Sequence, residues 1–357
     1  MFYLPNAAID AIKIFSLGAA SFILAWWLTP FLTRFLYKHK LWRKEVRERA
    51  IDGKEVPIFK KFHSEGEINT PRFGGLLIWT VPLILATIFF LLSQTDFSWW
   101  LRKLNFLSRS QTWLPFFALI SAALLGLVDD VMQTRGKEGK YIGGGLNLKR
   151  RIILMGLIGV VGGWWFFTKL GWSTLHVPGM GDFEIGIWYI PLFVFVMMAT
   201  YSGGVIDGLD GLAGGAFASM FAAFAGISLF LGQVDLAAFC TVIVGAILAF
   251  LWFNIPPAKF YMGETGIMAL CATLTVVAFM TDSVLVLPII GLLLVVEAGS
   301  VILQLLSKKF RKKKIFLAAP IHHHFEAKGW PSYKITMRFW IIGVIAAIIG
   351  VTIRLLG

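Results

Sequence analysis

Long apolar runs alternate with short polar segments along the whole chain. Runs of about 17 to 25 apolar residues are long enough to cross the hydrocarbon core of a bilayer as helices. The pattern predicts about ten such helices, at residues 15–36, 73–92, 113–131, 152–168, 187–201, 212–231, 237–253, 266–281, 284–306 and 338–353. It therefore predicts an all-α polytopic integral membrane protein, in which residues 1–357 form a single transmembrane domain.

The distribution of Lys and Arg between the predicted helices indicates an orientation in the membrane. Twenty-five of these residues lie in alternate loops and only four lie in the loops between them. Because cytoplasmic loops carry the excess of positive charge, both termini are predicted to lie outside. The first apolar run is a retained helix and not a signal peptide, since its basic residues follow it. The net charge of +13 mostly reflects this topology.

Composition excludes several other classes of protein. Of the 357 residues, 57% are hydrophobic and 15% are charged, so no soluble domain is large enough to hold a groove-binding fold for nucleic acid. The two cysteines, Cys240 and Cys271, lie inside apolar runs and are typical of small packed side chains. The basic loops can instead attract anionic membrane lipids or an anionic substrate.

Acidic residues occur at the predicted cytoplasmic ends of three helices. Asp129 and Asp130 end the third helix, where negative charge opposes the helix dipole. Asp207 and Asp210 lie in the glycine-rich segment SGGVIDGLDGLAGG, and Glu264 lies in FYMGETG. A solvated helix end and simple helix capping are the structural alternatives. Five carboxylates on one side of the bilayer favour a site for a divalent cation and phosphate.

Two further loops carry polar side chains on the same predicted side. FNIPPAKFYMGETG holds Asn254 and Tyr261, which suit a stacked and hydrogen-bonded nucleobase, although Tyr is also a common interfacial anchor. AAPIHHHFE holds three consecutive histidines, for which contact with a polar substrate is favoured over a metal site. Glu297 lies deep in the ninth predicted helix, where either a function or a hydrogen bond between helices accounts for it.

Taken in order along the chain, the Asp pair, DGLDGLA, FN followed by MGETG, and PIHHHFE resemble the phospho-N-acetylmuramoyl-pentapeptide transferases. This family belongs to the polyprenyl-phosphate N-acetylhexosamine-1-phosphate transferase superfamily, and the similarity runs from about residue 70 to residue 340. The resemblance implies a Mg²⁺-dependent enzyme of the bacterial cytoplasmic (inner) membrane. Its reaction moves phospho-MurNAc-pentapeptide from UDP-MurNAc-pentapeptide to undecaprenyl phosphate and yields lipid I and UMP for peptidoglycan. A homodimer is compatible with the resemblance.

The same resemblance implies roles for individual residues. Asp129, Asp130 and Glu264 are the expected catalytic and metal-binding group, with Asp129 orienting or deprotonating the lipid phosphate and Glu264 ligating Mg²⁺. Asp207 shapes the neighbouring surface, and Lys149 neutralises pyrophosphate. The expected uridine pocket, in which Tyr261 stacks on uracil, consists of Gly208, Leu209, Asp210, Asn254 and Tyr261. The expected sugar-phosphate contacts are His322, His323 and His324.

Four features depart from the family pattern. Glu264 stands where Asp is usual, Gly204 where Asn is usual, and Gln133 where Lys is usual. The Lys that is usual shortly before TPRFGG is also missing, because Glu67 and Ile68 lie there. Positive charge near the site is therefore reduced, and Lys140, Lys149, Arg150 or Arg151 are candidates to replace it.

Two rival functions remain open at the level of sequence. A sister transferase of GlcNAc- or GalNAc-1-phosphate is disfavoured by the HHHFE loop. A transporter is disfavoured because the acids lie at the rim of the membrane and not at its midplane.

Overall fold

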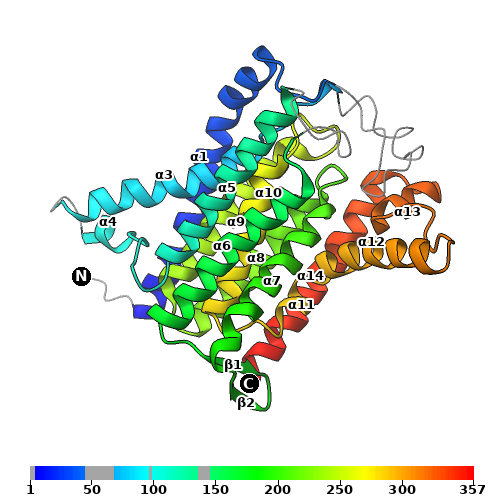
Figure 1. Cartoon of the computed structure of the whole chain (residues 1–357). Helices are drawn as coiled ribbons and strands as arrows, with labels where there is room; N and C mark the ends of the chain where they lie inside the picture. Colours follow the sequence, from blue (N-terminus) through cyan, green and yellow to red (C-terminus); the bar gives the residue numbers. More distant parts are fainter. Residues whose placement is uncertain (1–4, 45–67, 96–98, 136–144) are drawn as a thin grey trace.

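The structure is a computed structural model that describes residues 5–44, 68–95, 99–135 and 145–357 (Figure 1). It is almost entirely helical, which confirms the predicted fold class. The long helices are α1 (Asn6–Lys38), α3 (Gly75–Ser93), α5 (Trp113–Thr134), α6 (Leu148–Lys169), α7 (Tyr189–Gly203), α8 (Leu212–Phe230), α9 (Val234–Asn254), α10 (Gly263–Met280), α12 (Leu292–Phe310) and α14 (Ser332–Leu355). The short elements are α4 (Trp99–Lys103), β1 (Thr174–Val177), β2 (Gly181–Glu184), η1 (Gly186–Trp188), η2 (Gly204–Ile206), α11 (Leu287–Ile290) and α13 (Ile321–Ala327).

Within the described residues, nine helical segments are long and apolar enough to cross a membrane. The chain is thus a multi-pass membrane protein. Helix α10 is the central one, because 94% of its apolar window is buried against 17% for α1. Small residues let its neighbours approach closely: a Cβ on Gly126 of α5 would overlap the backbone of Glu264, and one on Gly75 of α3 would overlap Gly266. This packing fixes the start of α10 against two other helices.

The run at residues 284–306, expected as one helix, is divided. It forms the short helix α11 and the longer helix α12, which meet at Gly291. Glycine disfavours a continuous helix, and Pro288 lies in the first turn of α11. Figure 1 shows α12 and α13 diverging from the main bundle. Because Glu297, Lys308 and Lys309 interrupt its apolar surface, α12 is not among the nine spans.

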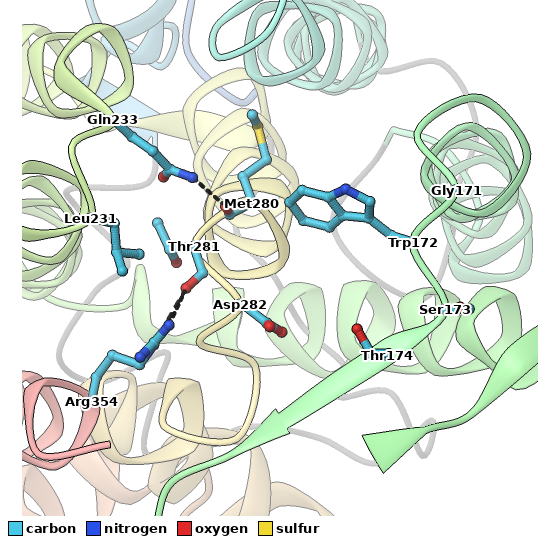
Figure 2. Close-up of a pocket in the computed structure, with 10 residues that line it drawn as sticks. All are labelled: Gly171, Trp172, Ser173, Thr174, Leu231, Gln233, Met280, Thr281, Asp282 and Arg354. Atoms are coloured by element: carbon cyan, nitrogen blue, oxygen red, sulfur yellow. Dashed lines mark hydrogen bonds between the residues drawn. The ribbon is translucent and has the colours of Figure 1, made fainter. Parts of the chain in front are cut away.

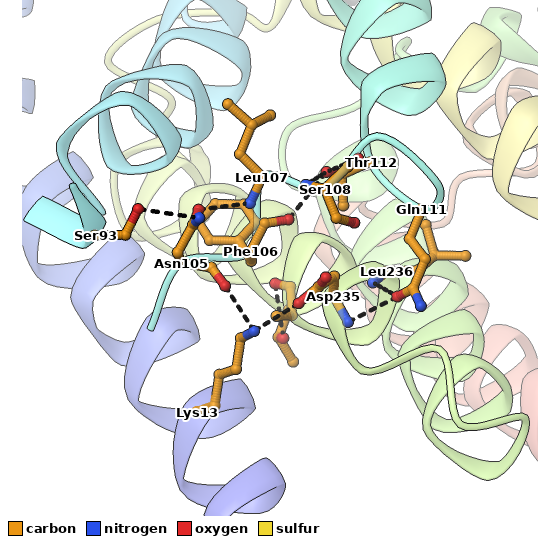
Figure 3. A network of polar contacts seen from close by, with 12 residues as sticks. Lys13, Ser93, Asn105, Phe106, Leu107, Ser108, Gln111, Thr112, Asp235 and Leu236 are labelled. Atoms are coloured by element: carbon orange, nitrogen blue, oxygen red, sulfur yellow. Dashed lines mark hydrogen bonds and ion pairs between the residues drawn. The ribbon is translucent and has the colours of Figure 1, made fainter. Parts of the chain in front are cut away.

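The start of α1 and the end of α14 lie at the same end of the bundle. Lys13 of α1 contacts Asp235 at the start of α9 and donates to the Asn105 carbonyl (2.7 Å; Figure 3). At this end the antiparallel hairpin β1–β2 receives the end of the chain, where Gly179 N donates to Gly357 O (2.7 Å). The hairpin was not predicted, since its strands have only four residues each. The side of the membrane on which this end lies stays a prediction, and we call it the hairpin end.

Candidate active site

Asp130 joins the end of α5 to the beginning of α10 at the end of the bundle opposite the hairpin. Its Oδ1 accepts from Glu264 N (3.0 Å), and its Oδ2 accepts from Thr265 N (2.9 Å). The first amides of a helix lack partners within the helix and carry partial positive charge, so a carboxylate from another helix satisfies them. Asp130 is fully buried. It therefore fixes the position of the backbone that carries Glu264.

Asp129 is also fully buried, and each of its oxygens accepts hydrogen bonds from the protein. Oδ1 accepts from Leu146 N (2.5 Å), and Oδ2 accepts from Gln133 Nε2 (2.6 Å). Gln133 in turn accepts two hydrogen bonds from Arg43, from Nε at 3.1 Å and from Nη2 at 2.7 Å. At the position where the resemblance implies Lys, a neutral amide thus connects Asp129 to a guanidinium.

Arg151 bridges two of the predicted catalytic acids. Its Nη1 donates to Glu264 Oε1 (2.6 Å), and its Nη2 lies 2.9 Å from Asp129 Oδ2. The Arg151 side chain is 6% exposed, whereas that of Glu264 is 22% exposed. A charge-assisted pair at this depth is short and orders both partners. Lys149, the predicted neutralising residue, is exposed in the first turn of α6, so the structure places Arg151 and not Lys149 at the acids.

Arg72 supplies a second positive charge beside the acids. Its Nε lies 3.8 Å from Asp130 Oδ1, and its charge also acts on Asp207. Burial raises the pKa of the Asp207 carboxyl to about 6, while the Arg72 guanidinium acts to lower it. The backbone amide of Gly263 also donates to Asp207. The structure therefore brings Asp207 to the same end of α10 as Glu264.

The glycine-rich DGLDG segment is held against the loop that leads into α10. Asn254 Oδ1 accepts from Gly211 N (2.9 Å), and Asn254 Nδ2 donates to Phe260 O (2.9 Å). Asp210 Oδ2 accepts from Ala258 N (3.1 Å). These contacts unite the two segments that carry the predicted uridine pocket.

Other members of this predicted pocket lie on the same two segments. Leu209 is buried, with 6% of its surface exposed. Tyr261 is half-buried, and its backbone pairs with residues 71 and 74: its N donates to the Pro71 carbonyl (2.8 Å) and its O accepts from Gly74 N (2.9 Å). The ring is thus carried on a backbone segment fixed from both sides.

The three histidines of α13 have three different environments. His322 Nδ1 lies 2.8 Å from Glu297 Oε2, and both side chains are fully buried. His323 Nδ1 lies 2.6 Å from Glu326 Oε2. His324 Nδ1 accepts from Leu317 N (3.1 Å), and desolvation, with the Lys328 charge, lowers the pKa of His324. The sequence left two explanations for Glu297, a function or a hydrogen bond between helices. The structure shows that Glu297 forms a hydrogen bond between α12 and α13.

His322 also links α13 to the DGLDG segment. A Cβ on Gly208 would overlap the His322 ring, so only glycine allows this approach. Among the described residues, the buried His322 Nε2 and Glu297 Oε1 atoms have no hydrogen-bond partner. Buried polar atoms without partners are uncommon in proteins and are often explained by function or an additional ligand.

The acids offer an all-oxygen donor set, which suits Mg²⁺. In the described part of the chain, no choice of one carboxylate oxygen each from Asp129, Asp130 and Glu264 places all three oxygens within 4.8 Å of one another. Both Asp side chains already accept protein hydrogen bonds, and Glu264 is the most exposed of the three. Mg²⁺ commonly keeps several waters and uses only one or two carboxylates together with substrate phosphates. The residues therefore fit a Mg²⁺ ion for which Glu264 is the most accessible protein ligand.

The structure is a bundle of membrane-spanning helices with paired carboxylates and arginines at one end, an arrangement that suits a membrane enzyme acting on phosphate groups. The sequence matches glycosyl transferase family 4 over residues 112–282, a range that contains Asp129, Arg151 and Glu264. The chain belongs to the phospho-N-acetylmuramoyl-pentapeptide-transferase family.

Three members show the extent of the similarity. The protein from Chloroflexus aurantiacus is 33% identical over 97% of this chain and 91% of its own length. The protein from Geobacillus thermodenitrificans is 34% identical over 94% of this chain and 96% of its own length. The protein from Levilactobacillus brevis is 37% identical over 82% of this chain and 86% of its own length. Each is named phospho-N-acetylmuramoyl-pentapeptide-transferase.

Proposed function

We propose that this protein transfers phospho-MurNAc-pentapeptide from UDP-MurNAc-pentapeptide to undecaprenyl phosphate, producing lipid I and UMP at the bacterial cytoplasmic membrane. The observation that carries the proposal is the arrangement of Asp129, Arg151 and Glu264 at one end of α5, α6 and α10. It lies within the part of the chain that matches glycosyl transferase family 4. The near full-length similarity to proteins named for this transfer supports the choice of donor.

The reaction brings several negative charges together. An oxygen of the lipid phosphate attacks the donor phosphorus that carries the sugar and forms a new P–O bond. The bond from that phosphorus to the bridging oxygen breaks, and UMP leaves with the electron pair. Positive groups held in fixed positions lower the cost of such a transition state because they need no reorganisation. Arg151 and Arg72 are the described cations that contact the acids of this site.

The buried residues act by position as well as by charge. Asp130 holds the beginning of α10, so it orients Glu264. Gln133 and Arg151 fix the position of the Asp129 carboxylate, which is proposed to orient or deprotonate the lipid phosphate. The DGLDG segment and Tyr261 are proposed to hold uridine, with the histidines of α13 at the sugar phosphate.

Glu264 is proposed as the direct Mg²⁺ ligand, with Asp129 and Asp130 beside it. When bound, Mg²⁺ offsets phosphate charge as a Lewis acid. The longer Glu side chain extends to the partly exposed rim of the site, where it also meets Arg151. A bound Mg²⁺ would therefore share the Glu264 carboxylate with the Arg151 guanidinium.

The test is a transfer assay with the full-length protein in detergent. Undecaprenyl phosphate and Mg²⁺ are supplied with either UDP-MurNAc-pentapeptide or UDP-GlcNAc, and UMP and the lipid-linked product are measured. We expect product from the muramoyl donor alone. Glu264→Gln and Asp129→Asn should each lower the rate by about 10²- to 10³-fold, the usual effect of removing one preorganised electrostatic group.

The matched control is Glu184→Gln, which removes an exposed acid from the opposite end of the molecule and should leave the rate unchanged. Turnover of UDP-GlcNAc without turnover of the muramoyl donor would instead assign a sister transferase. Full activity in EDTA would contradict the proposed Mg²⁺ requirement.

A further inference from the structure

Three potential metal ligands meet at the hairpin end of the bundle. His176 on β1 lies opposite Asp182 in the register of the hairpin, and its Nδ1 is 2.7 Å from Asp182 Oδ1. Asp282 follows the end of α10, and its Oδ1 accepts from His176 N (3.3 Å). One ligand atom from each residue lies within 4.8 Å of the others. In the part of the chain that the structure describes, no other three His, Cys, Asp or Glu side chains satisfy this criterion.

The two nitrogens of the His176 ring both face oxygen acceptors. Nδ1 faces the Asp182 carboxylate, and Nε2 lies 2.9 Å from Gly357 O. A neutral imidazole has one N–H and one lone pair, so it cannot donate to both. In the tautomer whose Nε2 donates to Gly357 O, the Nδ1 lone pair faces the Asp182 carboxylate, and a metal ion can bind to both when they move apart by a few tenths of an ångström. When Nε2 donates to a carbonyl, Nδ1 is presented as a ligand, which is the usual arrangement of metal-binding histidines.

The ligands are reachable from solvent. The Asp182 side chain is 61% exposed and that of His176 is 17% exposed. Asp282 lines a cavity of about 380 Å³ between the residues before β1, the end of α10 and α14 (Figure 2). Arg354, the cationic side chain in the cavity wall, donates to Ser283 Oγ (3.2 Å) and Thr281 O (3.4 Å). A metal ion and its waters thus have access to Asp282.

We propose that His176 Nδ1, Asp182 and Asp282 bind a Zn²⁺ ion at the hairpin end of the protein. One imidazole and two carboxylates, with water as the fourth ligand, match the tetrahedral coordination of Zn²⁺. An imidazole ligand disfavours Mg²⁺ and Ca²⁺, which take oxygen donors. The ion connects the hairpin to the end of α10. This site is separate from the transfer site, because the 18 residues of α10 extend over about 27 Å between Glu264 and Asp282.

Metal binding to the full-length protein in detergent tests the proposal. After treatment with EDTA and buffer exchange, the protein is titrated with Zn²⁺ and the bound metal is measured after gel filtration. Co²⁺ serves as a spectroscopic probe, because tetrahedral Co²⁺ gives visible absorption bands. We expect one high-affinity Zn²⁺ per chain and a rise in the thermal unfolding midpoint. His176→Gln and Asp282→Asn should each weaken binding by about 10- to 100-fold or more.

Two control variants separate this site from its surroundings. Glu184→Gln removes another acid from β2 and should bind Zn²⁺ as the wild type does. Glu264→Gln should also bind Zn²⁺ normally, even though it impairs transfer, so failure of the two proposals is distinguishable. Asp182→Asn, at an exposed position, provides a ligand variant that keeps the fold if His176→Gln does not.

Two outcomes would overturn the proposal. One is the absence of bound Zn²⁺ in a titration that reaches millimolar concentration, which would leave only a hydrogen bond between His176 and Asp182. The other is equal Zn²⁺ affinity in the wild type, Asp182→Asn and Asp282→Asn, which would place the metal elsewhere.

Discussion

The two ends of α10 use acidic residues in opposite ways. At its beginning, Asp129 and Asp130 are fully buried, and their oxygens accept from amides and face arginines. At its end, Asp182 is largely exposed and Asp282 borders a solvent-accessible cavity. Burying a carboxylate is costly unless hydrogen bonds and opposite charges compensate for lost hydration. The first arrangement fixes the geometry of charge at the site of the proposed transfer, whereas the second leaves side-chain oxygens open to solvent, as the proposed ion site requires.

The largest expected effect comes from removing the cation at the buried end. Arg151→Gln leaves Asp129 and Glu264 without the guanidinium that bridges them. We expect the transfer rate to fall by about 10³-fold and the unfolding free energy to fall by about 3–5 kcal/mol, the usual cost of breaking a buried ion pair. Initial rates of UMP release and the thermal unfolding midpoint measure the two effects.

Arg151→Lys and Lys169→Gln sharpen that measurement. Arg151→Lys keeps the charge but has no planar fork to bridge two carboxylates, so an intermediate rate is expected. Lys169→Gln removes an exposed cation at the other end of the same helix and should have no effect on transfer. A rate in Arg151→Gln close to that of Lys169→Gln would contradict the assigned role.

The second-largest effect on the transfer rate is expected from a variant that changes the packing at the buried end and leaves every charge in place. Gly126→Ala places a methyl group against the backbone of Glu264, so α5 and α10 must separate. A displacement of about 1 Å at a catalytic group can lower a rate by about 10²-fold, and overpacking should destabilise the fold by about 1–3 kcal/mol. The same assay and unfolding measurement apply. Gly156→Ala on α6, where no atom of the described residues lies within 4 Å of the added methyl, is the matched control and should behave as the wild type.

The amino-acid sequence alone was sufficient to predict the elements that depend on a local pattern of apolar and polar residues. The apolar runs predicted the membrane-spanning helices, and the common side of Asp129, Asp207 and Glu264 predicted that they gather at one end. The division at Gly291 was missed because the apolar pattern continues across it. Four-residue strands such as β1 are too short for a clear alternation.

The partners of the acids depend on contacts between residues far apart in the chain. Arg151 is 113 residues from Glu264, so no local pattern selects it over Lys149. Lys149 and Arg151 lie about 200° apart around α6, so their side chains point to opposite faces and only Arg151 contacts the acids. The hydrogen-bonded connection from Arg43 through Gln133 to Asp129 could not be predicted either. From sequence alone, the neutral amide of Gln133 was interpreted as a loss of positive charge. Lys140, another candidate for that charge, lies outside the described residues.

A smaller effect is expected at the junction of α12, α13 and the DGLDG segment. Glu297→Gln keeps the shape but removes the charge that faces His322. We expect the transfer rate to fall by about tenfold, since hydrogen bonds to charged groups contribute about 1.5–3 kcal/mol. A double-mutant cycle on unfolding free energy with His322→Gln should give a coupling of about 0.5–3 kcal/mol. The cycle with His324→Gln should be additive, because His324 contacts Leu317 instead; equal coupling in both cycles would contradict this arrangement.

The smallest effect on activity is expected at the hairpin end, where Lys13→Met removes a cation from the network in Figure 3. Lys13 Nζ contacts Asp235 Oδ1 and the Asn105 carbonyl, and its side chain is only 12% exposed. Losing this partly buried contact should lower the unfolding free energy by about 1 kcal/mol, seen as a fall of a few degrees in the thermal midpoint. The transfer rate below that midpoint should stay unchanged, because the acids near Arg151 keep all their described partners. A loss of transfer activity as large as that expected for Glu297→Gln would contradict this expectation. It would mean that the hairpin end and the end that carries Asp129 and Glu264 are coupled through the helices of the bundle.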